Sequence, residues 1–189
     1  APKRVEEMIQ QHEGFEQTAI NFIKPTEGES FTLATLKEMA IECTACDLCR
    51  DATQTVFGTG PVEAKIVLLG EQPGDQEDIV GVPFVGPAGK VLKEAIDNAG
   101  LDRDKLYLTN VVKHFKHIET HTEESPNGKR RLHQKPNARE VRCCRPWFDA
   151  EWSCLEDAEF LVCLGETAAR AILGPGNKIS KVRGRLLST

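Results

Sequence analysis

The chain has 189 residues, of which 40% are hydrophobic and 28% charged, and its formal net charge is −5. This size and composition predict one soluble globular domain and exclude a wholly disordered chain. No run approaches the roughly 20 apolar residues of a membrane-spanning helix, and the N-terminus lacks the apolar core of a signal peptide, so we expect neither a transmembrane nor a secreted protein.

The predicted elements begin with a polar N-terminal arm over residues 1–34, followed by one α/β domain over 35–189. Apolar, β-branched runs that end at Gly or polar residues predict strands, and one-sided apolar spacing predicts helices. In chain order we expect a helix over 35–41, a strand over 65–70, a helix over 87–99, a strand over 106–112, a helix over 137–157 capped by Asn137, a strand over 160–165 and a helix over 166–173.

The alternation of strands and helices predicts an α/β fold with a mostly parallel sheet. Ligands bind such sheets at the carboxyl ends of the strands, where this sequence places GEQPG, TNVVKH and GETA. Residues 116–136 are expected to form a long irregular loop, and such loops are often functional. We therefore expect an active site where the strand ends and this loop meet.

The charge is unevenly distributed along the chain. Residues 113–145 hold nine Lys and Arg against four Glu, together with four of the five histidines, so the rest of the chain is strongly acidic. Its densest part is Lys129, Arg130 and Arg131, followed by Leu132 and His133. Such a cluster is either a solvated loop or a phosphate clamp that holds His133 near a nucleic-acid backbone.

Seven cysteines, an odd number, disfavour a disulfide scaffold and favour metal binding or buried thiols in a reducing cytoplasm. Cys43, Cys46 and Cys49 form C-x2-C-x2-C, a density of thiols that packing alone rarely produces. The fourth Cys and the Pro of a bacterial ferredoxin run are missing. A zinc site would require a second pair of ligands at close spacing. Cys154 and Cys163 are expected to be core residues.

The other metal ligands are expected about a hundred residues later, where Cys143 and Cys144 are adjacent. Neighbouring residues of a helix point in different directions, so only one of the two is expected to bind the metal. A fourth ligand could come from His114 or His117, because neutral imidazole suits iron and zinc. The spacing therefore predicts Cys43, Cys46, one of the adjacent pair and a histidine.

The loop after the first predicted strand combines two glycines with two carboxylates and an amide, in Gly70, Glu71, Gln72, Gly74 and Asp75. It lacks the Lys-Ser or Lys-Thr of a Walker P-loop. Glycines let a ligand approach the backbone, and the side chains could read polar edges.

Two further residues near the strand ends are candidates for contact with a base. Phe84 is either a core residue or a platform for stacking on a base. Asn110 is either a turn residue or the complement of a nucleobase edge, since its amide presents a donor beside an acceptor.

Taken together, GEQPGDQED, GVPFVGPAGK, TNVVK, KRRLH, CRPW and CLGETAA resemble the uracil-DNA glycosylase superfamily, in its iron–sulfur, family 4-like branch. Three details are similar to the UdgX type, which cross-links to uracil-containing DNA. These are Gln72 in GEQPG, His114 directly after TNVVK, and the KRRLH segment. The resemblance covers about residues 43–187 and leaves only the N-terminal arm outside it.

The resemblance implies a role for each candidate. Phe84 would stack on a flipped uracil, Asn110 would bind its polar edge, and Gly70, Gln72 and Asp75 would line the base site or position water and sugar. Glu71 would stabilise positive charge on the sugar. The implied phosphate contacts are Lys129, Arg130 and Arg131, and the implied ligands of a structural [4Fe–4S] cluster are Cys43, Cys46, His114 and Cys144.

The implied reaction is excision of uracil from DNA by an enzyme of an intracellular, cytoplasmic, bacterial type. His133 would then attack the deoxyribose C1′ and remain bonded, giving single turnover and a covalent protein–DNA complex that forms also on single-stranded DNA. The alternatives are a conventional hydrolytic glycosylase with turnover, a non-catalytic metal-binding DNA module and an electron-transfer iron–sulfur protein. The incomplete ferredoxin spacing disfavours the last of these.

The family fold implied by the resemblance is a three-layer α/β/α sandwich around a central four-stranded sheet. In the family a further strand and a His-Pro-Ser motif follow the segment that matches Val182–Leu187, whereas this sequence stops at Thr189. We therefore expect the last strand and the DNA-intercalating loop to be missing from this chain, and a monomer that a further C-terminal segment completes.

Overall fold

The computed structural model describes residues 19–23, 31–122 and 129–188. Its elements are η1 (Ala19–Phe22), α2 (Leu33–Ile41), α3 (Leu48–Asp51), β1 (Ile66–Gly70), α4 (Asp75–Val80), α5 (Pro87–Asn98), η2 (Arg103–Lys105), β2 (Leu106–Asn110), β3 (His117–His121), β4 (Lys129–His133), α6 (Ala138–Cys154), β5 (Phe160–Cys163), α7 (Glu166–Leu173) and α8 (Ile179–Val182). In these ranges no helix is both long and apolar enough to cross a membrane.

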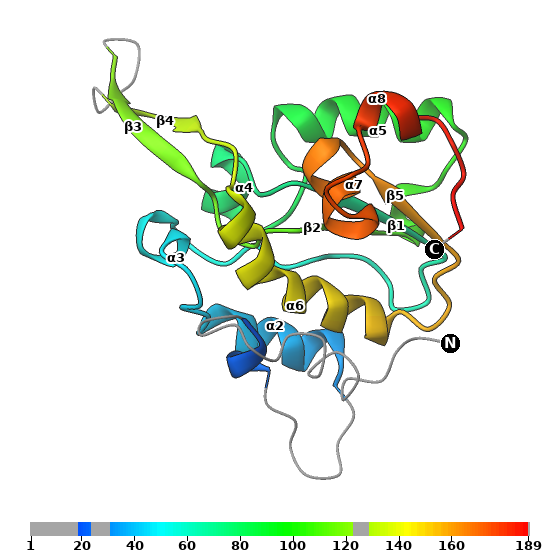
Figure 1. Ribbon diagram of the computed structural model, residues 1–189, viewed down its shortest axis with the longest axis horizontal. Coiled ribbons are helices and arrows are strands. Elements are labelled where there is room, and N and C mark those ends of the chain that lie inside the picture. Colours follow the sequence, from blue (N-terminus) through cyan, green and yellow to red (C-terminus); the bar gives the residue numbers. More distant parts are fainter. Residues whose placement is uncertain (1–18, 24–30, 123–128, 189) are drawn as a thin grey trace.

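The centre of the fold is a parallel three-stranded sheet in the order β2-β1-β5 (Figure 1). β1 lies in the middle, and its residues Val67, Leu68, Leu69 and Gly70 are all buried, as in a strand that is covered on both faces. Helices cover both faces of this sheet, so the predicted α/β fold with a mostly parallel sheet is confirmed.

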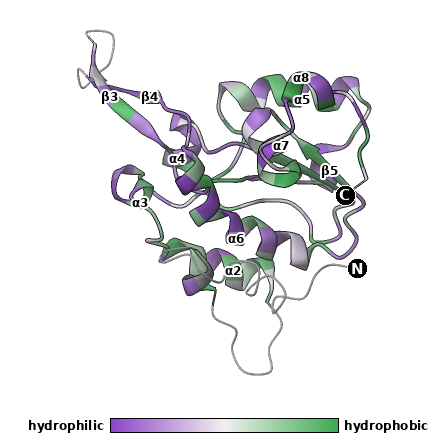
Figure 2. Ribbon diagram, in the orientation of Figure 1, coloured by the Kyte–Doolittle hydropathy of each residue, from purple (hydrophilic) through white to green (hydrophobic). Residues whose placement is uncertain are grey.

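Alternate strand residues face the two helical layers. On one face, Leu68, Leu106 and Leu108 pack with Ile96 of α5. On the other face, Val67 and Leu69 belong to a larger core that includes Trp147 of α6 and side chains of α2 and α7. Figure 2 shows apolar residues in the central strands and a mixture of polar and apolar residues along the helices.

All predicted helices and central strands are present, with small differences at their ends. The helix predicted over 35–41 begins at Leu33, because Thr32 and Thr35 form a reciprocal capping box. Asn137 caps α6 as expected, and its side chain accepts a hydrogen bond from the Glu140 backbone N–H. The division into an arm over 1–34 and a domain over 35–189 stays a prediction, since much of the arm lies outside the described residues.

The prediction of an irregular loop over 116–136 is wrong where the structure describes it, and residues 123–128 lie outside the described residues. β3 and β4 form an antiparallel hairpin that projects from the body of the domain (Figure 1). Charges of opposite sign face one another across it, and Lys129 Nζ lies 2.9 Å from Glu119 Oε2. Cross-strand pairs of this kind stabilise a hairpin that has little apolar surface, which is why hydrophobic patterning missed it.

A buried ion pair joins the carboxyl end of β2 to α6. Lys113 Nζ lies 2.5 Å from Glu151 Oε2, and both side chains are at most 1% exposed. The ammonium also donates to Thr109 Oγ1 and to the Asn110 carbonyl. The other carboxylate oxygen accepts from the Gly58 N–H and the Tyr107 hydroxyl. Every charge is therefore compensated, as a buried pair requires.

Glu151→Ala is expected to lower the free energy of unfolding by about 3–5 kcal/mol, because it leaves the Lys113 ammonium buried without a carboxylate. Urea unfolding followed by circular dichroism measures the change. The double variant Lys113→Met/Glu151→Met removes both charges at similar volume and should recover most of the loss. If the double variant were as unstable as the single one, the unpaired charge would not be the cause.

Candidate functional site

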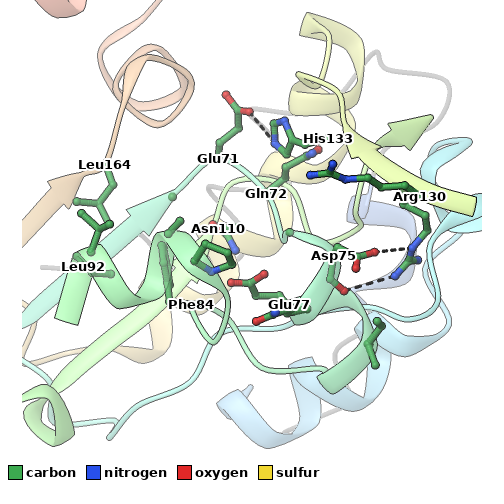
Figure 3. A pocket seen from close by; sticks show the side chains of 18 of the residues that line it. Glu71, Gln72, Asp75, Glu77, Phe84, Leu92, Asn110, Arg130, His133 and Leu164 are labelled. Carbon is green, nitrogen blue, oxygen red and sulfur yellow. Dashed lines mark hydrogen bonds and ion pairs between the residues drawn. The ribbon is translucent and has the colours of Figure 1, made fainter. Parts of the chain in front are cut away.

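A cavity of about 1060 Å³ opens at the carboxyl edge of the sheet, where the sequence predicted a site. Its walls come from the loop after β1, the first turns of α4 and α5, the end of β2 and the hairpin strand β4 (Figure 3). Nine of the predicted base-binding, catalytic and phosphate-contacting residues line it: Gly70, Glu71, Gln72, Asp75, Phe84, Asn110, Lys129, Arg130 and Arg131. His133 lines it as well.

Asn110 and Phe84 form the inner part of this cavity. Asn110 is only 3% exposed, and no other described residue makes a hydrogen bond with its side-chain amide. A Cβ on Gly70 would clash with Asn110 Oδ1 and with the Phe84 ring, so glycine is needed for the three to meet. A buried amide without a partner carries a desolvation cost, which a polar ligand would remove.

Phe84 is held in a left-handed backbone conformation, with φ at 58°. For a bulky residue this conformation is strained by about 1–3 kcal/mol and persists only where its surroundings enforce it. Arg103 Nη2 donates to the Phe84 carbonyl at 3.2 Å, and a Cβ on Gly89 would clash with that carbonyl. The fold therefore aims this aromatic ring at the space beside Asn110 (Figure 3).

Glu71 and His133 face each other at the mouth of the cavity. His133 Nε2 lies 3.5 Å from Glu71 Oε1, and the imidazole is half exposed (Figure 3). Glu71 directly follows β1, whereas His133 ends β4. A nitrogen nucleophile and a carboxylate are thus placed together at the opening, where a ligand bound beside Asn110 would pass.

Arg131 fixes the hairpin to α4. Its Nε lies 2.6 Å from Asp75 Oδ1 and its Nη1 lies 2.6 Å from Asp78 Oδ2. The same guanidinium lies over the Phe115 ring, 5.4 Å from its centre. The sequence predicted Arg131 as a phosphate contact and Asp75 as a catalytic or water-positioning group. In this structure each neutralises the other, so we assign Arg131 to anchoring the hairpin.

Arg131→Met is expected to loosen the hairpin, because the fully buried Asp78 carboxylate loses its cation. Amide hydrogen exchange should become faster in β3 and β4 while it stays unchanged in β1. The neighbouring and exposed Arg130→Met is the matched control and should leave the exchange of both strands as it was. Equal protection of the hairpin in the Arg131 variant would contradict the anchoring role.

Gln72 also holds the hairpin through main-chain contacts. Its Nε2 donates to the carbonyls of Lys116 and Gln134, each at 3.1 Å, and its Oε1 accepts from the Lys116 N–H. These bonds use the side-chain groups that the sequence assigned to uracil. Lys129 and Arg130 remain exposed on the hairpin, as phosphate contacts would have to be.

The predicted cysteine ligands of the cluster lie near one another, and Cys144 contacts the backbone of Lys113. Cys43 and Cys144 are buried, and Cys46 is half buried. Two N–H groups point at their sulfurs: Trp147 Nε1 lies 3.2 Å from Cys43 Sγ and the Lys113 N–H nitrogen 3.2 Å from Cys144 Sγ. Such donors stabilise thiolates, the form that binds metals.

Burial raises the pKa values of these thiols, that of Cys46 to about 11. The nearby thiols of Cys49 and Cys143 raise the pKa values of Cys43 and Cys46 further. The two cysteines left without a role by the sequence therefore lie in the same group. A metal would have to displace the protons, so its affinity should fall as the pH falls.

His114 is buried, and its chemistry is suited to that of a metal ligand. Desolvation lowers its pKa to about 4, so the imidazole is neutral at physiological pH. Its Nε2 lies 2.9 Å from Thr55 Oγ1, and that hydroxyl donates to the Ala40 carbonyl. The hydroxyl must then accept from Nε2–H, which leaves the lone pair on Nδ1.

The donor set fits an iron–sulfur or zinc group in its chemistry: thiols, a neutral imidazole and N–H groups directed at sulfur. Within the part of the chain that is described, no three His, Cys, Asp or Glu side chains already surround one metal position. The fit therefore rests on the donors and their burial rather than on a preformed arrangement.

Sequence reasoning missed several residues that shape the site. Thr167, at the start of α7, donates to the Glu71 carboxylate. Lys113 and Glu151 hold the end of β2, and Asp78 binds Arg131. Their partners are distant in the chain, so no local pattern could have revealed them; only the GETA segment after the third strand pointed to this edge.

Comparison with known proteins agrees with the resemblance carried by the sequence motifs, and the match extends over most of the chain. The model of the Uracil DNA glycosylase superfamily matches residues 57–187. The Type-4 uracil-DNA glycosylase of Archaeoglobus fulgidus is 35% identical over 150 residues, which cover 77% of this chain and 68% of the relative. That of Thermotoga maritima is 34% identical over 150 residues, covering 79% and 70%.

The Type-4 uracil-DNA glycosylase of Sulfurisphaera tokodaii is 34% identical over 159 residues, which cover 82% of this chain and 66% of the relative. The chain thus spans about two thirds of the length of these relatives. The matched region contains the whole sheet and all the residues that line the cavity. The chain belongs to the uracil-DNA glycosylase superfamily.

Proposed function

We propose that this protein is a uracil-DNA glycosylase that excises uracil from DNA and becomes covalently attached to the abasic sugar through His133. The observation that carries the excision activity is the buried Asn110 amide beside the Phe84 ring, which has no hydrogen-bond partner among the residues that the structure describes. Family membership and the names of the relatives, Type-4 uracil-DNA glycosylases, support it.

Base recognition follows from this geometry. The base must leave the helical stack, which costs a few kcal/mol and costs least when it is poorly paired. Inside the cavity its face would stack on Phe84, and its O4 and N3–H would meet the donor and the acceptor of Asn110. Cytosine presents the reverse pattern, so the amide orientation that matches uracil does not match cytosine.

Bond cleavage places negative charge on uracil and positive charge on the sugar C1′. The Asn110 amide would stabilise the first and the Glu71 carboxylate the second. In the capture step, the lone pair on His133 Nε2 forms the bond to C1′, and the resulting imidazolium loses its proton from Nδ1 to water. The electrons of the glycosidic bond leave with uracil, which takes up a proton when it is released. Nε2 lies 3.5 Å from Glu71 Oε1, so the attacking nitrogen is beside the carboxylate that would stabilise the charge on C1′.

The DNA strand would lie against the hairpin. Lys129 and Arg130 are exposed on the same strand as His133 and would contact the phosphates that flank the extruded nucleotide. These contacts depend on the charge of the phosphates and not on the base sequence, so single-stranded DNA should be accepted.

A denaturing gel tests the proposal directly. The protein is mixed with a labelled single-stranded oligonucleotide that contains one uracil, and with the same oligonucleotide containing thymine. We expect a shifted, denaturation-resistant band with uracil only. Free uracil without a shifted band would instead indicate a hydrolytic enzyme with turnover. Binding without release of uracil would indicate a non-catalytic DNA-binding module.

We also propose that Cys43, Cys46, His114 and Cys144 hold a [4Fe–4S] cluster. When bound, the cluster would tie the segment around α2 to α6 and thereby support the sheet. Cys46→Ser is expected to lose most of its iron and visible absorption, whereas the matched Cys154→Ser, outside the group, keeps both. Iron analysis and absorption spectra measure the two effects. One equivalent of zinc in place of iron would contradict the cluster.

A further inference from the structure

The first turn of α7 contacts both sides of the Glu71–His133 pair. Thr167 donates its hydroxyl hydrogen to Glu71 Oε2, while Glu71 Oε1 faces His133. The neighbouring Glu166 lies 3.1 Å from Lys135 Nζ, two residues beyond His133. Two consecutive residues of one helix thus reach the end of β1 and the exit of the hairpin.

The parallel sheet produces this convergence. β1 and β5 are adjacent, and the Leu164 N–H donates to the Leu69 carbonyl at 2.8 Å, so their carboxyl ends lie side by side. Glu71 follows one strand end and Thr167 the other. Thr167 is 7% exposed, whereas the Glu71 side chain is about a quarter exposed. The buried partner can therefore fix the orientation of the more exposed one.

We propose that Thr167 is a positioning residue for the reaction. Its hydroxyl holds one oxygen of Glu71, and this directs the other oxygen towards His133 Nε2 and the sugar. Without the hydroxyl, the carboxylate would rotate into solvent, because no other described residue bonds to Oε2. This inference rests on the proposed function of Glu71 and His133, and it gives a role to a residue of the GETA segment to which the sequence had assigned none.

The test compares Thr167→Val, which keeps the shape and removes the hydroxyl, with Thr167→Ser, which keeps the hydroxyl. Rates of uracil release and of covalent capture are measured on the single-uracil oligonucleotide under single-turnover conditions. We expect Thr167→Val to slow both about 10- to 100-fold, as a misplaced catalytic group does, and Thr167→Ser to stay near the unmodified protein. Thr59→Val, at an exposed position outside the cavity, is the matched control.

A double-mutant cycle separates positioning from general damage to the fold. In a Glu71→Gln background the Thr167→Val substitution should have little further effect, because the carboxylate that Thr167 orients is already gone. Additive losses would overturn the inference. Thr167→Ala replaces Thr167→Val in the cycle if the valine variant does not fold, as judged by circular dichroism.

The same experiment distinguishes the two levels of the proposal. If the unmodified protein releases no uracil, the proposed function fails and the inference fails with it. If it releases and captures normally while Thr167→Val does the same, only the inference is overturned. Release without capture would remove the role of His133 as a nucleophile, and a slower release by Thr167→Val would still support the action of Thr167 on Glu71.

Discussion

His133→Ala is expected to abolish the covalent adduct completely, because no other nitrogen nucleophile in the described chain is paired with Glu71. Uracil release should persist at a reduced rate, since Asn110, Phe84 and Glu71 still bind the base and stabilise the separating charges. Water would then react at C1′, and the enzyme would turn over. The denaturing gel and an assay for released uracil measure the two outcomes separately.

His121→Ala is the matched control, because His121 lies on the same hairpin and is exposed but does not line the cavity. It should cross-link like the unmodified protein. A persistent adduct in the His133 variant would show that another residue attacks C1′. Loss of the adduct in both variants would point to the hairpin surface rather than to the nucleophile.

Asn110→Ala is the second large effect. Removing one preorganised donor to a developing oxyanion typically costs about 10²- to 10³-fold in rate, and we expect a loss of that size in uracil release. Stability should change in the opposite direction. The amide is buried and has no partner in the described structure, so its removal should leave the free energy of unfolding unchanged or raise it slightly.

This opposition of activity and stability is diagnostic of a residue kept for ligand binding. Single-turnover release of uracil and urea unfolding measure the two quantities on the same preparation. Asn98→Ala, at the exposed C-terminal end of α5, is the matched control for activity and should match the unmodified protein. A large drop in stability for Asn110→Ala would mean that the amide has a structural partner, and the recognition role would lose its main support.

The elements with a strong apolar pattern were predictable from the sequence. β1, β5 and α5 lie where the pattern placed them, because each must bury an apolar face whatever its neighbours are. The hairpin was not predictable in this way. Ile118, its one large aliphatic residue on β3, is half exposed, and the strands are joined by backbone bonds and cross-strand charges.

In the candidate site, too, some features were predictable from the sequence and others were not. Strand-end position alone predicted that Glu71 and Asn110 would lie near each other, because parallel strands end at one edge. Nothing in the local sequence distinguished Arg131 from Arg130. Arg131 is partly buried and paired with two carboxylates, whereas Arg130 is exposed, and that difference arises only when the hairpin folds back onto α4.

By itself, then, the sequence determined the layered α/β architecture and the edge of the sheet at which the candidate site lies, and it named the candidate side chains, because apolar periodicity and residue type are local properties. The tertiary structure decided which of these side chains are free to act. It engaged Arg131, Asp75 and Gln72 in holding the hairpin, left the Asn110 amide without a partner among the described residues, and brought Thr167 to Glu71. Pairing of buried polar groups depends on partners that are distant in the chain and meet only after folding.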